Sequence, residues 1–342
     1  MHEEVFARIL KILVEKGLVR GKTLAVDATT LEANAAMKSI VRRETGESWS
    51  QYIGRLAVEE GIENPTEEDA RRLDRRRRRK RVSNKDWESK SDPASRITKM
   101  KDGRTHLAYK AEHVIDLESE VIVSAKIYPG DQADGTTIFE SLSQSQENIV
   151  RADAAAFAEE VVADKGYHKA AALAECAEWG IRTYIPERRD RAKRRWTDKP
   201  GEWKQAFRAN RRRVRGRRSR ALQRLRSERV ERSFAHVCRS GKQRRTWLRG
   251  LEDVQKRYLL TAAGRNLGLL MRHLFGIGTP RTLQGASAAL VAIFSVLLQP
   301  LRTIVRSIPM RWTRLVAYLG GLSPLTHSLP LPVEIGASST DC

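Results

Sequence analysis

The chain has 342 residues, of which 64 are Lys or Arg and 42 are Asp or Glu, so its formal net charge is +22. A charge of that sign favours a polyanionic partner, and nucleic acid is the most economical candidate. Cys176, Cys238 and Cys342 lack CxxC spacing, which argues against a disulfide framework or a zinc cluster and is typical of reduced thiols in a cytoplasmic protein.

The first segment is a predicted amphipathic helix over residues 3–16. It is too charged to be a signal peptide, because it lacks an uninterrupted apolar core. Residues 24–26 then read as a short buried strand that presents Asp27 at its end. We expect Thr29 to begin a turn or helix that contains Glu32.

Residues 40–99 form a predicted helical insertion. Helices are expected over residues 49–61 and 66–80, with Thr66 as the N-cap of the second. The second helix ends in an arginine run, which is either a solvated face or a patch that follows phosphates; the overall charge favours the patch. Residues 83–95 read as a polar connector.

Two apolar, partly alternating segments follow, residues 104–116 and 120–128, and their short connection predicts an antiparallel hairpin. His106 and His113 are expected to be ordinary strand residues within it. A loop then leads to a predicted helix over residues 137–150.

A second strand carries the next notable carboxylate. Val161 and Val162 suit a buried strand that ends at Asp164, Gly166 breaks the strand, and a helix is expected over residues 168–179. In open α/β sheets, ligands and metals bind at the carboxyl ends of the strands. The alternative is that the aspartate merely caps the following turn. Because the first strand repeats the arrangement, two accidental caps are less probable than one.

The region after a further strand at residues 181–185 is strongly basic. Residues 187–220 interleave Trp196, Trp203 and Phe207 with Arg and Lys. These aromatic residues fit either nucleic-acid stacking or the apolar side of a basic helix, and the sequence does not decide between them.

A helix is then predicted to run from Gly216 to Cys238, and a last apolar helix over residues 259–275. Glu231 lies beside the core-facing stripe of the first helix. Its neighbours Arg229 and Arg232 leave a helix-surface ion pair as the alternative role. Three apolar residues at helical spacing are expected to form that stripe: Val230, Phe234 and Val237.

The predicted order of elements is typical of an α/β fold with a mixed sheet of about five strands, one antiparallel hairpin and surrounding helices. Three carboxylates, Asp27, Asp164 and Glu231, are the candidates for chemistry. Oxygen ligands of this kind suit Mg²⁺ or Mn²⁺, and two such ions can activate an attacking oxygen and steady a leaving one. Without a cation the three carboxylates would repel one another, so the cluster predicts a metal site.

The motifs VDATTLEANA, VVADKGYH, SERVERSFAHV, RRTWLRG and KRYLLTAAGRNLGLLMR resemble DDE-class transposases of bacterial insertion sequences over residues 18–281. The resemblance implies a ribonuclease-H-like core in which Asp27, Asp164 and Glu231 bind two Mg²⁺ or Mn²⁺ ions. Glu228 is the rival for the third position, but the VER context favours Glu231. The resemblance also implies DNA as partner, a homodimer on DNA, and a cytoplasmic, nucleoid-associated protein.

Two features depart from the family. About 26 residues precede Asp27, so we expect residues 1–20 to be the remnant of a longer helical region that recognises element ends. The family often places a basic residue seven positions after the glutamate, where this chain has Cys238, followed by Arg239. The catalytic domain is expected over residues 21–280.

Residues 281–342 are expected to form an apolar helix and a flexible tail. Residues 282–301 are uncharged and about as long as a membrane span, but polar residues interrupt them and cations flank them on both sides, so we expect no span. Eight arginines are expected to contact nucleic acid: Arg211, Arg212, Arg213, Arg224, Arg229, Arg232, Arg244 and Arg245.

Three functions are compatible with these features. The first is a transposase that cleaves DNA at element ends and joins the freed 3′-hydroxyl to target DNA. The second is a metal-dependent nuclease that uses the same carboxylates for hydrolysis only. The third is a basic DNA-binding protein without catalysis, such as a truncated, non-mobile remnant.

Overall fold

The computed structural model describes residues 1–77, 82–100, 103–188 and 195–276. The chain divides into two units, Met1–Thr279 and Pro280–Cys342. The predicted segment 282–301 and the end of the arginine run therefore lie outside the described residues. No helix in the described part of the chain is long and apolar enough to cross a membrane.

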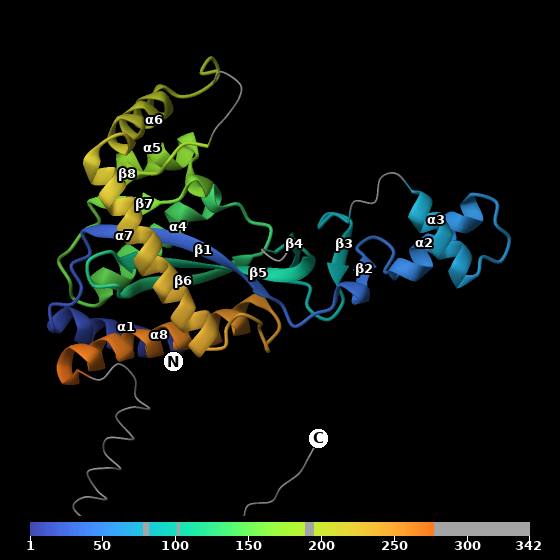
Figure 1. Ribbon diagram of the computed structural model, residues 1–342, viewed down its shortest axis with the longest axis horizontal. Helices are drawn as coiled ribbons and strands as arrows, with labels where there is room; N and C mark the ends of the chain where they lie inside the picture. The colour runs from blue at the N-terminus through green and yellow to red at the C-terminus, as the bar shows by residue number, and fades with distance from the viewer. Residues whose placement is uncertain (78–81, 101–102, 189–194, 277–342) are drawn as a thin grey trace, which may run out of the picture. The chain divides into compact units, whose positions relative to one another are not determined.

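A six-stranded mixed sheet is the centre of the first unit (Figure 1). Its order is β4-β5-β1-β7-β8, and β6 pairs with β5. β1 is antiparallel to β5 and parallel to β7, and β7 is parallel to β8. This arrangement is consistent with the ribonuclease-H-like fold. The strands are β1 (Thr23–Glu32), β4 (Arg96–Lys99), β5 (Thr105–Asp116), β6 (Ile122–Pro129), β7 (Glu160–Ala163) and β8 (Arg182–Tyr184).

Helices surround the sheet, and a small second sheet of β2 (Ile40–Arg42) and β3 (Trp87–Ser89) lies in the insertion. The long helices are α1 (His2–Glu15), α2 (Trp49–Glu59), α3 (Glu67–Arg76), α4 (Asp134–Arg151), α5 (Ala170–Glu178), α6 (Gly201–Val214), α7 (Arg217–Phe234) and α8 (Leu251–Phe275). Shorter helical turns are η1 (Met37–Ser39), η2 (Lys165–Tyr167) and a π-helical segment, η3 (Ala235–Ser240).

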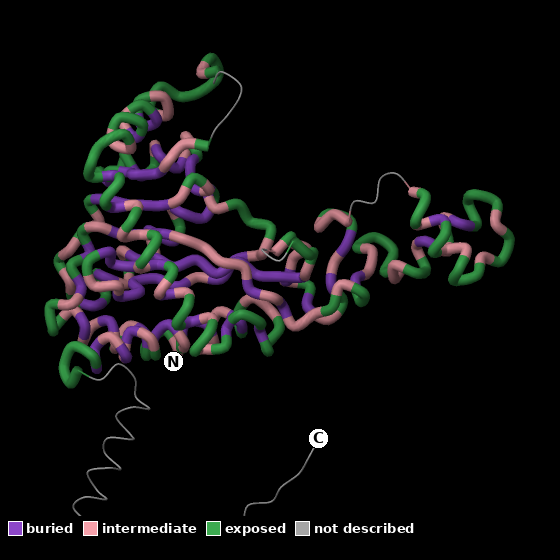
Figure 2. The backbone as a smooth tube through the Cα atoms, in the orientation of Figure 1, coloured by how far each residue is buried: buried purple, intermediate pink, exposed green. Residues whose placement is uncertain are grey.

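The two faces of the sheet are covered by different helices. Side chains alternate along a strand, so neighbouring residues of β5 point to opposite faces. Lys110 bonds to Thr137 of α4, whereas His113 bonds to Ser233 of α7 and Tyr258 of α8. With helices on both faces, residues 107–116 of β5 and all of β7 are buried on both sides, whereas residues 27–30 of β1 are only partly buried (Figure 2).

Most elements of the core confirm the predictions from sequence. The hairpin β5–β6, the helices α1, α2 and α4, and the strands β7 and β8 all occur where their patterns placed them. Thr66 caps α3 in a capping box with Asp69, as its sequence indicated. Val230 and Val237 are fully buried, and Phe234 packs against the core.

The prediction of a turn or helix at Thr29 is wrong. β1 continues through Glu32, because residues 28–32 pair with β5 as far as Ala108. Asp27 therefore lies in the middle of a ten-residue strand and not at its end. The β-branched Thr29 and Thr30 fit this extended conformation, and tertiary pairing decides against a turn.

The polar connector predicted at residues 83–95 is also wrong in part. It contains β3, whose Trp87 is buried between Trp49 and Tyr52 of α2. β4 follows it and pairs with β5. Short polar strands carry little periodicity, so their sequence did not reveal them. The last helix, α8, begins at Leu251 and so eight residues before its predicted start.

Candidate active site

Asp27 lies in β1, and Asp164 directly follows β7, the parallel strand beside it. β1 and β7 pair with Val26 opposite Ala163, so the residues that follow them, Asp27 and Asp164, are neighbours across the sheet. The strands hold both positions rigidly, because residues 24–26 and 161–163 are fully buried. The interaction of the two carboxylates contributes to the pKa shift of Asp27. The structure thus brings together two of the three predicted carboxylates.

Asp27 is paired with a residue that the sequence did not single out. Arg226 of α7 donates from Nη1 to Asp27 Oδ2 at 2.6 Å, and the Asp27 side chain is 26% exposed. Burial raises the pKa of Asp27; the Arg226 guanidinium opposes this shift, and the carboxylate of Asp164 adds to it. Arg226 also donates from Nε to Gln223, whose amide bonds to the carbonyls of Ala163 and Tyr184.

Asp164 caps the turn that follows its strand, as the structural alternative proposed. Its Oδ1 accepts from the Gly166 amide at 2.6 Å. A Cβ at Gly166 would lie 2.5 Å from Asp134 Oδ2 and 2.7 Å from Asp164 Oδ1. Gly166 is therefore required for the close approach of a further carboxylate, that of Asp134 at the start of α4.

A buried polar network lies beneath this turn, on the α4 face. Lys110 Nζ lies 3.2 Å from Glu112 Oε2 and 3.0 Å from Asp134 Oδ1. Tyr167, which follows the Asp164 turn, donates to Glu112 at 2.9 Å, and Thr137 donates to the same oxygen at 2.7 Å. Burial, and then the Glu112 charge, raise the pKa of Tyr167 well above its usual range, so the phenol remains a donor. These bonds to Glu112 Oε2 hold the turn, whereas Glu112 Oε1 is buried without a hydrogen-bond partner.

On the opposite face, the cross-strand neighbour of Asp27 is His113. It is fully buried and stacks on Phe234. Burial, with a smaller effect of Arg265, lowers the pKa of His113 to about 3. The neutral ring bonds through Nδ1 to Ser233 at 2.9 Å and through Nε2 to Tyr258 at 2.7 Å. His113 lies in β5 as expected, and its two bonds join that strand to α7 and α8.

Glu231 is exposed on α7, the helix that carries Arg226. Among the described residues, no group of three or more His, Cys, Asp or Glu side chains is arranged to hold a metal ion. The structure therefore does not bring Glu231 into the pair of Asp27 and Asp164. Glu228, the rival, forms an ion pair with Arg232 at 2.5 Å.

The oxygen donors of Asp27 and Asp164 fit a hard divalent cation, since a cation would remove the repulsion between them. Arg226 supplies the compensating positive charge at Asp27 in this structure. The geometry thus places the carboxylates of Asp27 and Asp164 close together, with the Arg226 guanidinium as the positive charge beside Asp27.

The eight predicted DNA-contacting arginines fall into two groups. Arg212, Arg224 and Arg244 are exposed. The other five contact protein groups: Arg211 pairs with Glu187, Arg213 bonds to Thr183, Arg229 bonds to the carbonyls of Leu117 and Glu118, Arg232 pairs with Glu228 and Glu120, and Arg245 lies 3.8 Å from Glu32.

The aromatic residues of the basic region partly resolve the open alternative. Phe207 is buried, and its ring contacts Trp196 and His168. These contacts make Phe207 part of the apolar side of α6. Trp203 is half-buried near the start of the same helix.

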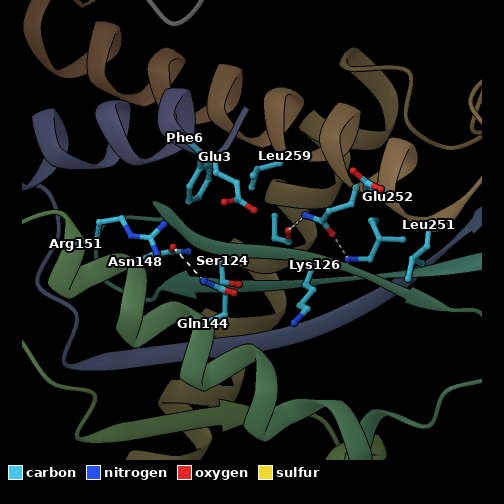
Figure 3. Close-up of a pocket in the computed structure, with 13 residues that line it drawn as sticks. Glu3, Phe6, Ser124, Lys126, Gln144, Asn148, Arg151, Leu251, Glu252 and Leu259 are labelled. Atoms are coloured by element: carbon cyan, nitrogen blue, oxygen red, sulfur yellow. Dashed lines mark hydrogen bonds between the residues drawn. The ribbon is translucent and has the colours of Figure 1, made fainter. Parts of the chain in front are cut away.

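A cavity of about 410 Å³ lies apart from these carboxylates (Figure 3). Phe6 of α1, Lys126 of β6 and Leu259 of α8 contribute to its lining, and neither Asp27 nor Asp164 does. Gln255 bonds to the backbone of Ile127 and Ala125 at 2.6 and 2.9 Å and so occupies the free edge of β6. The cavity lies between the helices α1, α4 and α8 and the strand β6, whose edge is covered by Gln255.

Comparison with known protein families gives a match. Residues 165–271 match the model of the transposase DDE domain. The match supports a DDE-class transposase. It covers less than half of the chain, begins one residue after Asp164, and includes Glu231 together with the eight arginines. A search of curated proteins and one of solved structures found no match. The match and the mixed sheet together support a transposase-type, nucleic-acid-processing function.

Sequence reasoning missed Arg226, Asp134 and Lys110. An arginine within a helix of many arginines carries no distinctive signal. Asp134, in the segment PGDQADG, reads from sequence as a loop residue, but it is the first residue of α4. Their roles arise from pairing across long sequence separations, which only the folded chain provides.

Proposed function

We propose that the chain is a DNA transposase that cleaves DNA at element ends and transfers the freed 3′-hydroxyl to target DNA. The observation that supports this most is the adjacency of Asp27 and Asp164 on parallel strands of a ribonuclease-H-like sheet. The DDE-domain match over residues 165–271 supports the same reaction class.

Asp27, Asp164 and Glu231 would hold two Mg²⁺ or Mn²⁺ ions. Such ions supply activation of the attacking oxygen and stabilisation of the leaving oxygen in an in-line displacement. Asp27 is held by β1, and Asp164 by its own turn with Gly166. Glu231 would approach from α7, so binding of the third carboxylate requires an adjustment of that helix or of its side chain.

Arg226 has a defined part in this proposal. Its guanidinium neutralises Asp27 at 2.6 Å, so cation binding at Asp27 must displace it. Once displaced, Arg226 remains on the same helix as the exposed Arg224. There its positive charge is available to a DNA phosphate, which charge-assisted hydrogen bonds favour.

The test uses a plasmid that carries the DNA flanking this reading frame, incubated with the full chain and Mg²⁺. The expected products are 3′-hydroxyl ends and their joined products with a second, labelled plasmid. Asp27→Asn, Asp164→Asn and Glu231→Gln should each abolish both products while DNA binding persists. Nicks without joining would favour a nuclease, and binding without either product a non-catalytic protein.

A further inference from the structure

The loop between η3 and α8 exposes a large aromatic side chain. Trp247 is 69% exposed and is the most exposed tryptophan of the described residues. None of the aromatic ring pairs in the described part of the chain includes it. Trp179, the next most exposed at 47%, instead packs edge-to-face on Phe139 with ring centroids 4.8 Å apart. An indole left in water costs free energy that a partner surface would recover.

The backbone beneath Trp247 is fixed to β1. The Glu32 amide donates to the Arg244 carbonyl at 3.0 Å, and the Thr246 amide donates to the Glu32 carbonyl at 2.8 Å. Asn34 donates from Nδ2 to the Trp247 carbonyl at 2.9 Å, and Arg249 donates from Nε to the Asn34 carbonyl at 3.1 Å. The indole is therefore exposed on a preorganised support, which lowers the ordering cost of binding.

The surroundings of Trp247 are cationic. Residues 242–249 include Lys242, Arg244, Arg245 and Arg249 and no acidic residue. The Arg245 side chain is 64% exposed. Arg245 and Arg249, together with Glu32, line a cavity of about 510 Å³ beside the loop. The positive charge of these side chains attracts a polyanion, and it would not attract a protein surface that lacks acidic residues.

We propose that Trp247 stacks on an unpaired base of bound DNA while the neighbouring arginines neutralise its phosphates. An indole face gains free energy from any base face, but a paired duplex offers base faces only at its ends or where a base is extruded. The ligand is therefore DNA with an unpaired segment. This inference rests on the proposed DNA partner and not on catalysis.

Trp247 lies well away from the carboxylates along β1. From Asp27 to Glu32, to which residues 244 and 246 are bonded, is five residues of the strand, which is about 17 Å at about 3.4 Å per residue. The stacking contact is therefore separate from the carboxylate pair.

The test measures DNA binding by the full chain in EDTA, so that cleavage does not enter. The probes are a fully paired duplex and the same duplex with an unpaired overhang of about five nucleotides. We expect Trp247→Ala to weaken overhang binding about 5- to 150-fold and duplex binding less than about 2-fold. Trp247→Phe should restore most of the loss, and Trp179→Ala, the matched control, should change neither affinity.

Two further measurements locate the contact. The fluorescence of 2-aminopurine, placed at successive overhang positions, should be quenched at one preferred position by the native chain and at none by Trp247→Ala. The slope of log affinity against log salt should be unchanged in Trp247→Ala, since no phosphate contact is lost, and should fall by about 0.9 in Arg244→Gln.

The outcomes separate this inference from the proposed function. If the native chain binds neither probe, the DNA partner itself is wrong. If it binds both and Trp247→Ala binds the overhang like the native chain, only the stacking role is wrong. Equal losses of affinity for both probes in Trp247→Ala would also overturn stacking. So would a change of oligomeric state with unchanged DNA affinity, which would indicate that Trp247 contacts a second copy of this chain.

Discussion

Asp27 and His113 are cross-strand neighbours beneath α7, yet their surroundings are opposites. His113 is neutral, fully buried, and bonded on both nitrogens to Ser233 and Tyr258. Asp27 is partly exposed, and its carboxylate accepts from the Ala28 amide and from the Arg226 guanidinium. A closed network resists rearrangement, whereas one ion pair at the edge of solvent can exchange its partner. The comparison teaches that α7 is fixed at Ser233 by His113, whereas at Arg226 its ion pair with Asp27 can be exchanged for another cation.

The largest expected effect is on catalysis. Replacing Asp164 by Asn keeps the shape of the side chain but removes the charge that a divalent cation requires. Loss of metal-assisted stabilisation worth several kcal/mol should lower strand cleavage by at least about 10³-fold. Single-turnover cleavage measures the effect, and unchanged duplex affinity is the control. Cleavage within about tenfold of the native rate would remove Asp164 from the active site.

His113, whose two ring nitrogens are both hydrogen-bonded, should contribute to stability. His113→Ala would remove the Nε2 partner of the Tyr258 hydroxyl and one of the two bonds of Ser233, which keeps its bond to the Val230 carbonyl, and would leave a cavity beside Phe234. We expect a loss of about 2–4 kcal/mol in the free energy of unfolding. Urea denaturation measures it, with His106→Ala on the same strand as a control, since His106 is only partly buried. Equal, small losses in both variants would contradict the closed network.

The same histidine predicts a pH dependence. Its pKa is about 3 in the fold and about 6.5 in an unfolded chain, so the unfolded state takes up a proton first as the pH falls below about 6.5. Stability is therefore complete above that pH and declines below it, by about 2 kcal/mol at pH 5. His113→Gln should lack this part of the decline. Parallel pH profiles for the two proteins would show that His113 does not resist protonation.

A smaller effect separates two adjacent arginines of α6. Arg212 is exposed, whereas Arg213 donates from Nε to the Thr183 carbonyl at 3.0 Å. We expect Arg212→Gln to lower the salt slope of DNA binding by about 0.9 without a change in stability. Arg213→Gln should instead cost about 1 kcal/mol of stability. The reverse pattern would assign the phosphate contact to the packed arginine.

The sequence predicted the elements whose signals are local or strongly periodic. The β5–β6 hairpin, the Thr66 cap and the buried strand before Asp164 are of this kind. It failed where tertiary pairing decides, as at Thr29, whose strand is extended by β5. Within the site, Asp27 and Asp164 could be predicted because each directly follows a buried apolar run. Arg226 could not, because its partner lies 199 residues away.

The central claim is that Asp27 and Asp164 form a cation site whose counter-charge is Arg226. Calorimetric titration of the DNA-free full chain with Mn²⁺ tests it most directly. We expect Arg226→Gln to bind Mn²⁺ about tenfold more tightly than the native chain, since no charge-assisted hydrogen bond must be broken. Arg224→Gln, an equal charge change on an exposed neighbour, should bind like the native chain, and Asp27→Asn should not bind at this site. Native affinity in Asp27→Asn, or no gain in Arg226→Gln beyond that of Arg224→Gln, would contradict the account.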